Sequence, residues 1–193
     1  MKMVKDMQIG AVILAAGAST RLGRPKQTLQ LDGETLLDRA VRVSMEAGLS
    51  EIVVVLGAFA EEIRGTCKLK GCRPVVNHAW KDGIAASIRL GISELKAVRG
   101  AIMMTCDMPF VTAAHLIEFA TREKVTASRY AGGPGVPAFF PVASFPDLVK
   151  LHWSAGAKAL LSSAETIDLH EGEFDIDSQE DLDRMRALGF DLH

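Results

Sequence analysis

Runs of apolar residues that alternate with segments of helical periodicity constrain the fold of this chain most strongly. Residues 9–15 and 52–56 are continuous apolar runs, which is the pattern of strands buried on both faces of a sheet. In residues 36–45, by contrast, apolar side chains recur at spacings of three and four, as on one face of a helix. This alternation predicts an α/β fold with a mostly parallel sheet and helices on both faces.

The same pattern extends through most of the chain. Up to residue 125 we expect two more strands, over residues 74–76 and 101–105, and two further helices, over residues 60–67 and 83–95. We also expect a helix that begins after Thr112, which caps it. Beyond residue 125 we expect strands over residues 126–130 and 136–140, separated by Gly132-Gly133-Pro134-Gly135. Next we expect short helices near residues 145–150 and 156–161 and a strand over residues 166–169. The final helix is capped by Ser178, and Asp181 completes a capping box.

The bulk composition excludes several classes of protein. A formal net charge of −2 over 193 residues argues against nucleic acid or an anionic membrane as a partner, because both bind positive patches. No apolar run reaches the roughly 18 residues of a membrane span, and the N-terminus lacks the apolar region of a signal peptide. Three cysteines make no disulfide framework. We therefore expect a single cytoplasmic domain over residues 1–193.

The loop that follows the first strand concentrates positive charge. Arg21, Arg24 and Lys26 lie within six residues, and Gly17 lets the backbone approach an anion closely. Small residues at positions 15, 16 and 18 leave backbone N–H groups open to phosphate oxygens. A solvated basic turn is the alternative, but the preceding strand and the glycine favour a polyphosphate site. The loop matches neither the P-loop nor the dinucleotide-binding glycine pattern.

Two acidic residues are candidates for holding a metal. Asp107 follows a strand directly, and Asp177 lies in the segment Asp175-Ile176-Asp177. Carboxylates at strand ends suit Mg²⁺, a hard cation that prefers oxygen ligands. Asp107 could instead cap the following turn, and for Asp175 we favour a simple strand-end charge. Phosphate oxygens and water would complete the coordination shell.

A third polar segment, residues 77–87, runs from a strand end into a helix. Asn77 and Ser87 can read a base or a ribose through hydrogen bonds. Trp80 can stack on a flat ligand or pack half-buried. We interpret His78 as a surface residue.

Together these segments resemble a known family. The loop Leu14-Ala15-Ala16-Gly17-x-Ser19-x-Arg21-Leu22-Gly23-x-x-Lys26 closely resembles the signature of the nucleotidyltransferases of molybdenum cofactor biosynthesis. The resemblance continues, in chain order, through Asn77-x-x-Trp80-x-x-Gly83-x-x-x-Ser87, Asp107-Met108-Pro109, Gly135-x-Pro137 and Asp175-Ile176-Asp177. It covers nearly the whole chain.

The resemblance implies a three-layer Rossmann-like nucleotidyltransferase fold and Mg²⁺-dependent transfer of a nucleoside monophosphate. Residues 9–125 would form the nucleotide-binding half and residues 126–193 the acceptor-side half. Carried over by motif position, the nucleotide-binding residues are Leu14, Ala15, Ala16, Gly17, Arg21, Lys26, Asn77, Gly83 and Ser87. The catalytic residues are Arg21, Lys26 and Asp107, and the Mg²⁺ ligands are Asp107 and Asp177.

The chain looks most like the molybdenum cofactor cytidylyltransferase branch, which implies CTP as donor and molybdopterin as acceptor. The guanylyltransferase branch, which uses GTP, usually has Ala-Gly-Gly where this chain has Ala15-Ala16-Gly17. A molybdoenzyme or a cofactor-delivery protein is the partner that this resemblance implies.

Two departures from the family pattern lie on the acceptor side. Val136 stands where the branch usually has histidine, and residues 153–158 read Trp-Ser-Ala-Gly-Ala-Lys where a Gly-Asp-x-Gly-Ala-Arg segment is usual. A lysine in place of arginine loses a bidentate fork. Two further hypotheses follow: transfer to another acceptor such as a sugar phosphate, and a non-catalytic nucleotide sensor or partner protein.

Overall fold

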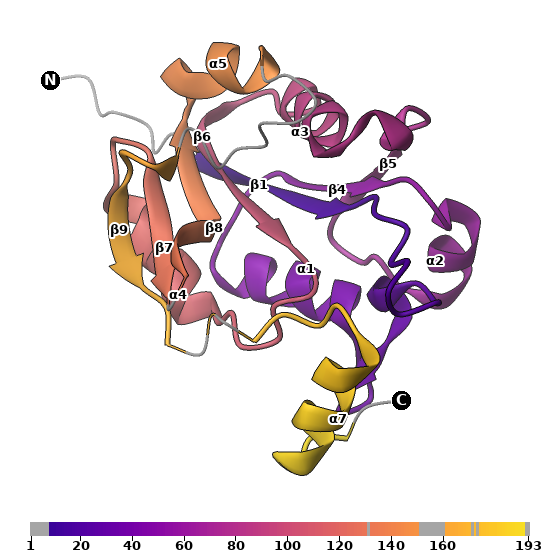
Figure 1. The fold of residues 1–193 in the computed structure, drawn as a ribbon. Coiled ribbons are helices and arrows are strands. Elements are labelled where there is room, and N and C mark those ends of the chain that lie inside the picture. The colour runs from indigo at the N-terminus through magenta and orange to yellow at the C-terminus, as the bar shows by residue number, and fades with distance from the viewer. Residues whose placement is uncertain (1–7, 131, 151–160, 171, 173, 192–193) are drawn as a thin grey trace, which may run out of the picture.

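The computed structural model describes residues 8–130, 132–150, 161–170, 172 and 174–191. Its centre is a seven-stranded sheet with the order β5-β4-β1-β6-β8-β7-β9 (Figure 1). The strands of this sheet are β1 (Gln8–Ala15), β4 (Ile52–Leu56), β5 (Arg73–Val76), β6 (Val98–Thr105), β7 (Thr126–Tyr130), β8 (Gly133–Pro141) and β9 (Glu165–Asp168).

The sheet is mostly parallel, as predicted. β1 pairs in parallel with both β4 and β6, and β4 pairs in parallel with β5. β8 runs antiparallel to both of its neighbours, β6 and β7, and β9 is again parallel to β7. The strands that follow residue 125 therefore extend the sheet built by the first part of the chain, with one strand reversed.

Helices cover both faces of the sheet. Side chains of α1, α2 and α4 pack in the cluster on one face, and those of α3 and α5 in the cluster on the other, so the fold has three layers (Figure 1). The helices of these layers are α1 (Leu36–Glu46), α2 (Ala60–Thr66), α3 (Ile84–Ser93), α4 (Ala113–Glu118) and α5 (Phe145–Val149). None of the described helices is long and apolar enough to span a bilayer.

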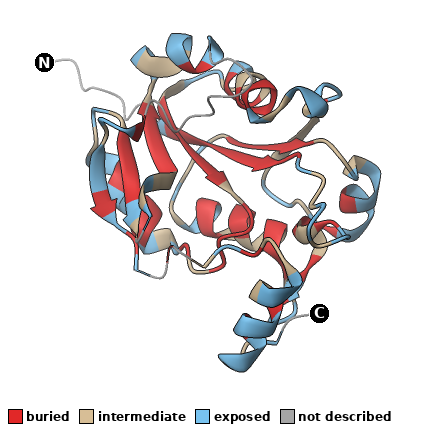
Figure 2. Cartoon of the chain, viewed as in Figure 1, coloured by how far each residue is buried: buried red, intermediate tan, exposed pale blue. Residues whose placement is uncertain are grey.

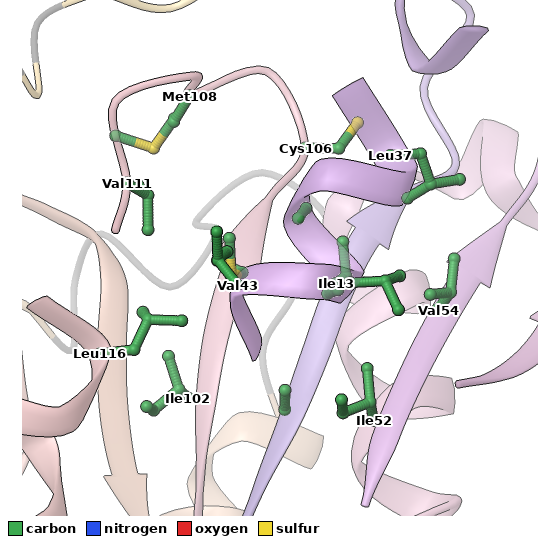
Figure 3. Packing of buried hydrophobic residues seen from close by; sticks show 14 of the residues in the cluster. Ile13, Leu37, Val43, Ile52, Val54, Ile102, Cys106, Met108, Val111 and Leu116 are labelled. Atoms are coloured by element: carbon green, nitrogen blue, oxygen red, sulfur yellow. The ribbon is translucent and has the colours of Figure 1, made fainter. Parts of the chain in front are cut away.

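The apolar run of β1 is divided between the two faces. Ile13 belongs to the cluster under α1, whereas its neighbours Val12 and Leu14 belong to the cluster under α3. This is the alternation that the pleat imposes on every strand. Because helices cover both faces, both sets of side chains are buried, and the run has no polar interruptions (Figure 2). Figure 3 shows the α1 side of the core, where Leu37 and Val43 lie near Ile13 and Val54.

A third, smaller cluster attaches the last helix to the start of the chain. Ile176, Leu182 and Met185 pack with Leu29, Leu31 and Leu36. Leu182 and Met185 belong to α7 (Gln179–Ala187), which begins with the predicted capping box between Ser178 and Asp181. The small hairpin of β2 (Gln30–Leu31) and β3 (Glu34–Thr35) supplies Leu31 to this cluster. The sequence pattern did not predict that hairpin.

Several element boundaries differ from the prediction. The glycine-rich segment expected as a loop belongs to β8, because Gly133 and Gly135 pair with β7. α3 begins one residue later than predicted, because Gly83 has a φ of +87° and serves as the N-cap of the helix. β6 begins at Val98, three residues before the predicted start. The helix predicted over residues 156–161 lies largely outside the described residues.

Candidate active site

The loop after β1 is held in shape by a buried side chain. Gln27, which is 1% exposed, donates from Nε2 to the carbonyl oxygens of Ala15 at 2.8 Å and Gly17 at 3.4 Å. Ser19 has a φ of +47°, and its hydroxyl oxygen accepts from the Lys26 backbone N–H at 3.2 Å. These bonds close the loop at both ends, so the small residues between them keep one conformation.

A first cavity of about 400 Å³ opens beside this loop. Eight of the eleven residues that the sequence proposed for the site line it, namely Leu14, Ala15, Ala16, Gly17, Lys26, Gly83, Ser87 and Asp107. Gly17 is exposed, and nothing lies within 4 Å of the position that a Cβ would take. The loop backbone is thus open to a ligand at this point, as its composition predicts.

Two acids and two bases from distant parts of the chain meet at the edge of this cavity. Lys26 donates from Nζ to Asp107 Oδ2 and, at 2.5 Å, to Asp177 Oδ1. Arg21 donates from Nη2 to the second oxygen of Asp177 at 2.6 Å. The backbone N–H of Ile176 donates to the Asp107 carbonyl oxygen at 2.9 Å, which fixes the two carboxylates relative to each other. The sequence-based prediction is that Arg21 and Lys26 bind phosphates. In the structure, which holds no ligand, both side chains pair with carboxylates.

Opposite charges stabilise each other in this cluster. Burial disfavours the ammonium of Lys26, but the carboxylates of Asp107 and Asp177 outweigh burial and raise the pKa of Lys26. Burial also works against the charge of Asp177, yet Lys26 and Arg21 lower the pKa of that carboxyl. The site therefore holds both signs of charge at neutral pH.

Asp107 and Asp177 fit a divalent cation. Asp107 Oδ1 is buried and has no hydrogen-bond partner among the described residues, while both carboxylates converge on one positive charge, Lys26 Nζ. Oxygen ligands of this kind suit Mg²⁺. The described part of the chain contains no group of three or more His, Cys, Asp or Glu side chains that could hold a metal. Two carboxylates would thus need oxygen ligands from elsewhere, as the sequence-based prediction assumed.

Asn77 and Ser87 are brought together but play unequal parts in the cavity. Asn77 donates from Nδ2 to Ser87 Oγ at 2.9 Å and accepts from the Ala79 N–H at 3.0 Å. Ser87 lines the first cavity, whereas Asn77 is not among its lining residues. Asn77 therefore orients Ser87 and the loop. Trp80 is half-buried and lines the cavity, with Lys81 Nζ 5.5 Å from its ring centre.

Some residues of the site were not singled out from the sequence. Gln27 and Thr105 line the first cavity, and Thr105 also lines a second cavity of about 400 Å³. That cavity is lined by Leu14, Ile84, Ile88, Met103, Thr105, Tyr130, Gly132, Gly133, Pro134, Gly135, Val136 and Leu161. Val136, the first departure from the family pattern, thus lies in it. The second departure, at residues 153–158, lies outside the described residues. A buried glutamine and a strand-end threonine leave no periodic signal that could have found them.

A third cavity, of about 260 Å³, adjoins the acids. Thr105, Asp107, Tyr130, Val136 and Asp175 are among its lining residues. Burial, followed by the charges of Asp177 and Asp107, raises the pKa of Asp175. Burial likewise raises the pKa of Tyr130, and the carboxylates of Asp175 and Asp107 add to the effect. Asp175 therefore lines the same cavity as Asp107. From the sequence alone we favoured a simple strand-end charge for Asp175.

The chain is similar to proteins of known families over most of its length. The family model for the MobA-like NTP transferase domain matches residues 11–168. A probable molybdenum cofactor guanylyltransferase of Opitutus terrae is 30% identical over 139 residues, which cover 69% of this chain and 67% of that protein. Nicotine blue oxidoreductase of Paenarthrobacter nicotinovorans is 36% identical over 102 residues, covering 52% of this chain and 50% of that protein.

Solved structures have a similar fold. Rv0371c of Mycobacterium tuberculosis superposes with a TM-score of 0.85 at 30% identity, covering 94% of this chain and 98% of that chain. A structure of Rv0371c in complex with manganese gives a TM-score of 0.79 at 29% identity, with 92% and 97% covered.

The matched segments span half or less of the first four curated relatives' own length. On the match of residues 11–168, this chain belongs to the MobA-like NTP transferase domain family, a family of nucleotidyltransferases.

Proposed function

We propose that the protein transfers a nucleoside monophosphate from a nucleoside triphosphate to a phosphorylated acceptor, molybdopterin, and releases pyrophosphate. The observation that carries this proposal is the meeting of Lys26 and Arg21 with Asp107 and Asp177 at the edge of the first cavity. Cations for phosphates and carboxylates for a metal are the two components that such a transfer needs.

Positioning and charge neutralisation account for the chemistry. The acceptor phosphate oxygen attacks the α-phosphorus, and the bond to the pyrophosphate oxygen breaks. Lys26 and Arg21 would stabilise the charge that gathers on the leaving pyrophosphate. The N–H groups of residues 15–18 would bind phosphate oxygens. Asp107 and Asp177 would hold Mg²⁺, which supplies charge neutralisation at the phosphate oxygens. The manganese in the similar Rv0371c structure supports a divalent metal.

The base of the donor has two supported candidates. The similarity to a probable molybdenum cofactor guanylyltransferase over 69% of this chain favours GTP. Ala16, at a position where the guanylyltransferase branch usually has glycine, favours CTP, the donor expected from the sequence. Both nucleotides belong in every assay of this protein.

The test is pyrophosphate release from GTP or CTP with Mg²⁺ and molybdopterin, run beside Asp107→Ala. We expect release from one nucleotide in preference to the other, and its loss in the variant. Release with a sugar phosphate but not with molybdopterin would replace the acceptor and leave the reaction class intact. Tight nucleotide binding without release for any acceptor would instead identify a nucleotide sensor, the hypothesis that the departures at Val136 and residues 153–158 motivate.

The setting of the reaction is part of the same proposal. Cys67, Cys72 and Cys106 are free thiols, which suits the reducing cytoplasm. A molybdoenzyme or a cofactor-delivery protein would receive the product. Neither a nucleic acid nor a membrane is required.

A further inference from the structure

The four charged side chains of the candidate active site are supported by one apolar cluster. Each of them has, within three residues along the chain, an apolar neighbour that belongs to the third cluster or packs against it. These neighbours are Leu22 beside Arg21, Leu29 after Lys26, Phe110 after Asp107 and Ile176 before Asp177. Three segments that lie far apart in the sequence therefore share one support.

Two aromatic rings, one from each side of α7, meet on Phe110. The centre of the Phe110 ring lies 5.4 Å from that of Phe174, which precedes Asp177 by three residues, and 5.3 Å from that of Phe190, which follows α7. The interplanar angles are 72° and 68°, and edge-to-face pairs of this kind attract each other beyond the burial of their surface. Phe110 thus contacts the segment of Asp177 on one side and the segment after α7 on the other.

Hydrogen bonds hold both ends of this ring contact. Arg39 of α1 donates from Nε to the carbonyl oxygen of Pro109 at 2.9 Å, immediately before the central ring. The backbone N–H of Asp32, between β2 and β3, donates to the carbonyl oxygen of Asp191 at 3.0 Å. Phe190 is therefore placed by its own ring and by the residue that follows it.

The rings can influence the site only through the residues that they support. Phe110 and Phe190 are not among the residues that line the first cavity. Asp107 and Asp177, in contrast, both contact Lys26 Nζ at its edge. Because Mg²⁺ requires oxygen ligands at about 2.0–2.1 Å in nearly ideal geometry, a small shift of one carboxylate relative to the other should weaken metal binding.

We infer that Phe190, acting through Phe110, is a positioning residue that keeps Asp177 at the distance from Asp107 that a divalent cation requires. The inference rests on the proposed function, because it takes both carboxylates as ligands of the metal. It gives a side chain beyond the last described helix, outside the first cavity, a role in the affinity of the site for its metal and nucleotide.

The test compares nucleotide binding to the full chain in Mg²⁺ and in EDTA. Isothermal titration calorimetry with GTP or CTP gives two dissociation constants, and their ratio is the factor by which the metal strengthens binding. Phe190→Ala should lower this ratio about tenfold, as is typical when a residue that supports a metal ligand is lost. Phe190→Tyr, which keeps the ring at a half-buried position, should have the wild-type ratio. If Phe190→Ala does not fold, Phe190→Leu replaces it, with a change expected in the same direction.

Two further variants separate positioning from general destabilisation. Leu188→Ala removes an exposed apolar side chain at the same end of α7 and should leave both the Tm and the ratio unchanged. Ile92→Val reduces the buried core under α3 and should lower the Tm but not the ratio. An unchanged ratio in a folded Phe190→Ala protein would overturn the inference, and so would an equal loss in Ile92→Val.

A double-mutant cycle tests the action through Phe110. In a Phe110→Leu background, Phe190→Ala should change the ratio little further, because the effects of two residues in contact are not additive. A full additional loss would contradict that route. Metal-dependent binding without pyrophosphate release would refute the proposed transfer but not the positioning role. Binding that does not depend on the metal in the wild type would overturn both metal ligands, and the inference with them.

Discussion

Lys26 Nζ lies 2.5 Å from Asp177 Oδ1, although 151 residues separate the two along the chain. The contact joins the loop after the first strand to the segment before the last helix. Lys26 also donates to Asp107, so one ammonium group balances two carboxylates. This arrangement defines which changes should affect the chemistry and which should not.

Removing the ammonium of Lys26 should abolish most of the transfer. Lys26→Ala is expected to lower kcat by about 100-fold to 1,000-fold, the typical loss when one charge-stabilising donor is removed. Arg24→Ala is a matched control, because Arg24 is an exposed cation of the same loop that does not line the first cavity. The measurement is steady-state pyrophosphate release. Equal kcat values for the two variants would remove Lys26 from the catalytic residues.

Binding of the nucleotide should depend on a divalent metal and on Asp177. A ligand at 100 times its dissociation constant adds about 2.7 kcal/mol to the free energy of unfolding, which a thermal shift detects. We expect GTP or CTP to raise the Tm with Mg²⁺ and to raise it far less with EDTA. Asp177→Asn should reduce the Mg²⁺-dependent part of the shift. The control is Asp183→Asn, which changes an exposed acid of α7 that pairs with Arg186 and should leave the shift unchanged. A Tm shift that depends neither on the metal nor on Asp177 would refute the assigned metal ligands.

The side chain of Gln27 should hold the loop rather than contact the nucleotide's reacting atoms. Gln27→Met keeps the length of the side chain but loses the donor to Ala15 and Gly17. Because a buried carbonyl oxygen is left unpaired, we expect a loss of about 1–3 kcal/mol in the free energy of unfolding, together with a higher KM for the nucleotide. Urea denaturation and initial rates measure the two effects. Gln30→Met, at an exposed position of the next strand, should change neither.

His115 should make the stability of the fold depend on pH. Burial lowers the pKa of His115, and the charge of Glu118 opposes this only in part. His115 Nε2 lies 2.7 Å from Ser128 Oγ, which itself donates to the Pro137 carbonyl oxygen at 2.6 Å, so the neutral ring donates to Ser128. In the unfolded chain the histidine takes up a proton at its ordinary pKa of about 6.5. In the folded state the ring stays neutral to a lower pH. The unfolded state then binds more protons, and the free energy of unfolding falls as pH decreases below about 6.5.

Urea denaturation at several pH values between 7.5 and 5 checks this effect. His115→Gln should flatten the dependence of stability on pH, whatever its effect on stability at pH 7.5. His78→Gln, at an exposed loop histidine, is the control and should keep the wild-type slope. An unchanged slope in His115→Gln would assign the pH dependence to other groups.

The sequence predicts the fold well where one local rule decides the structure. β1 and β4 are recognisable because helices cover both faces of each strand and leave no polar position. The capping box at Ser178 is a local hydrogen-bond pattern, and it is present. The glycine-rich start of β8 was missed, because glycine has no side chain to report the pairing with β7 that decides its conformation.

The candidate site, like the fold, could be predicted from the sequence only in part. The residues expected at the site come from short motifs of the sequence, and the structure brings eight of them to the first cavity. Five of these eight belong to the one contiguous loop motif over residues 14–26. The pairing of Arg21 with Asp177 could not be predicted, because it depends on how α7 packs against the start of the chain. The hydrogen bond from Asn77 to Ser87 could not be predicted either, because it joins a strand end to the following helix. The roles of all these residues in transfer stay predictions until the variants are measured.

The attachment of α7 to Leu29, Leu31 and Leu36 also has a consequence for synthesis on the ribosome. The strands and the loop that line the first cavity emerge early, and N-terminal parts of a chain fold first during translation. Asp177 and the helix that follows it emerge later. A nascent chain could therefore shape the cavity while still lacking one of the two carboxylates, so the proposed transfer could not begin before α7 had docked.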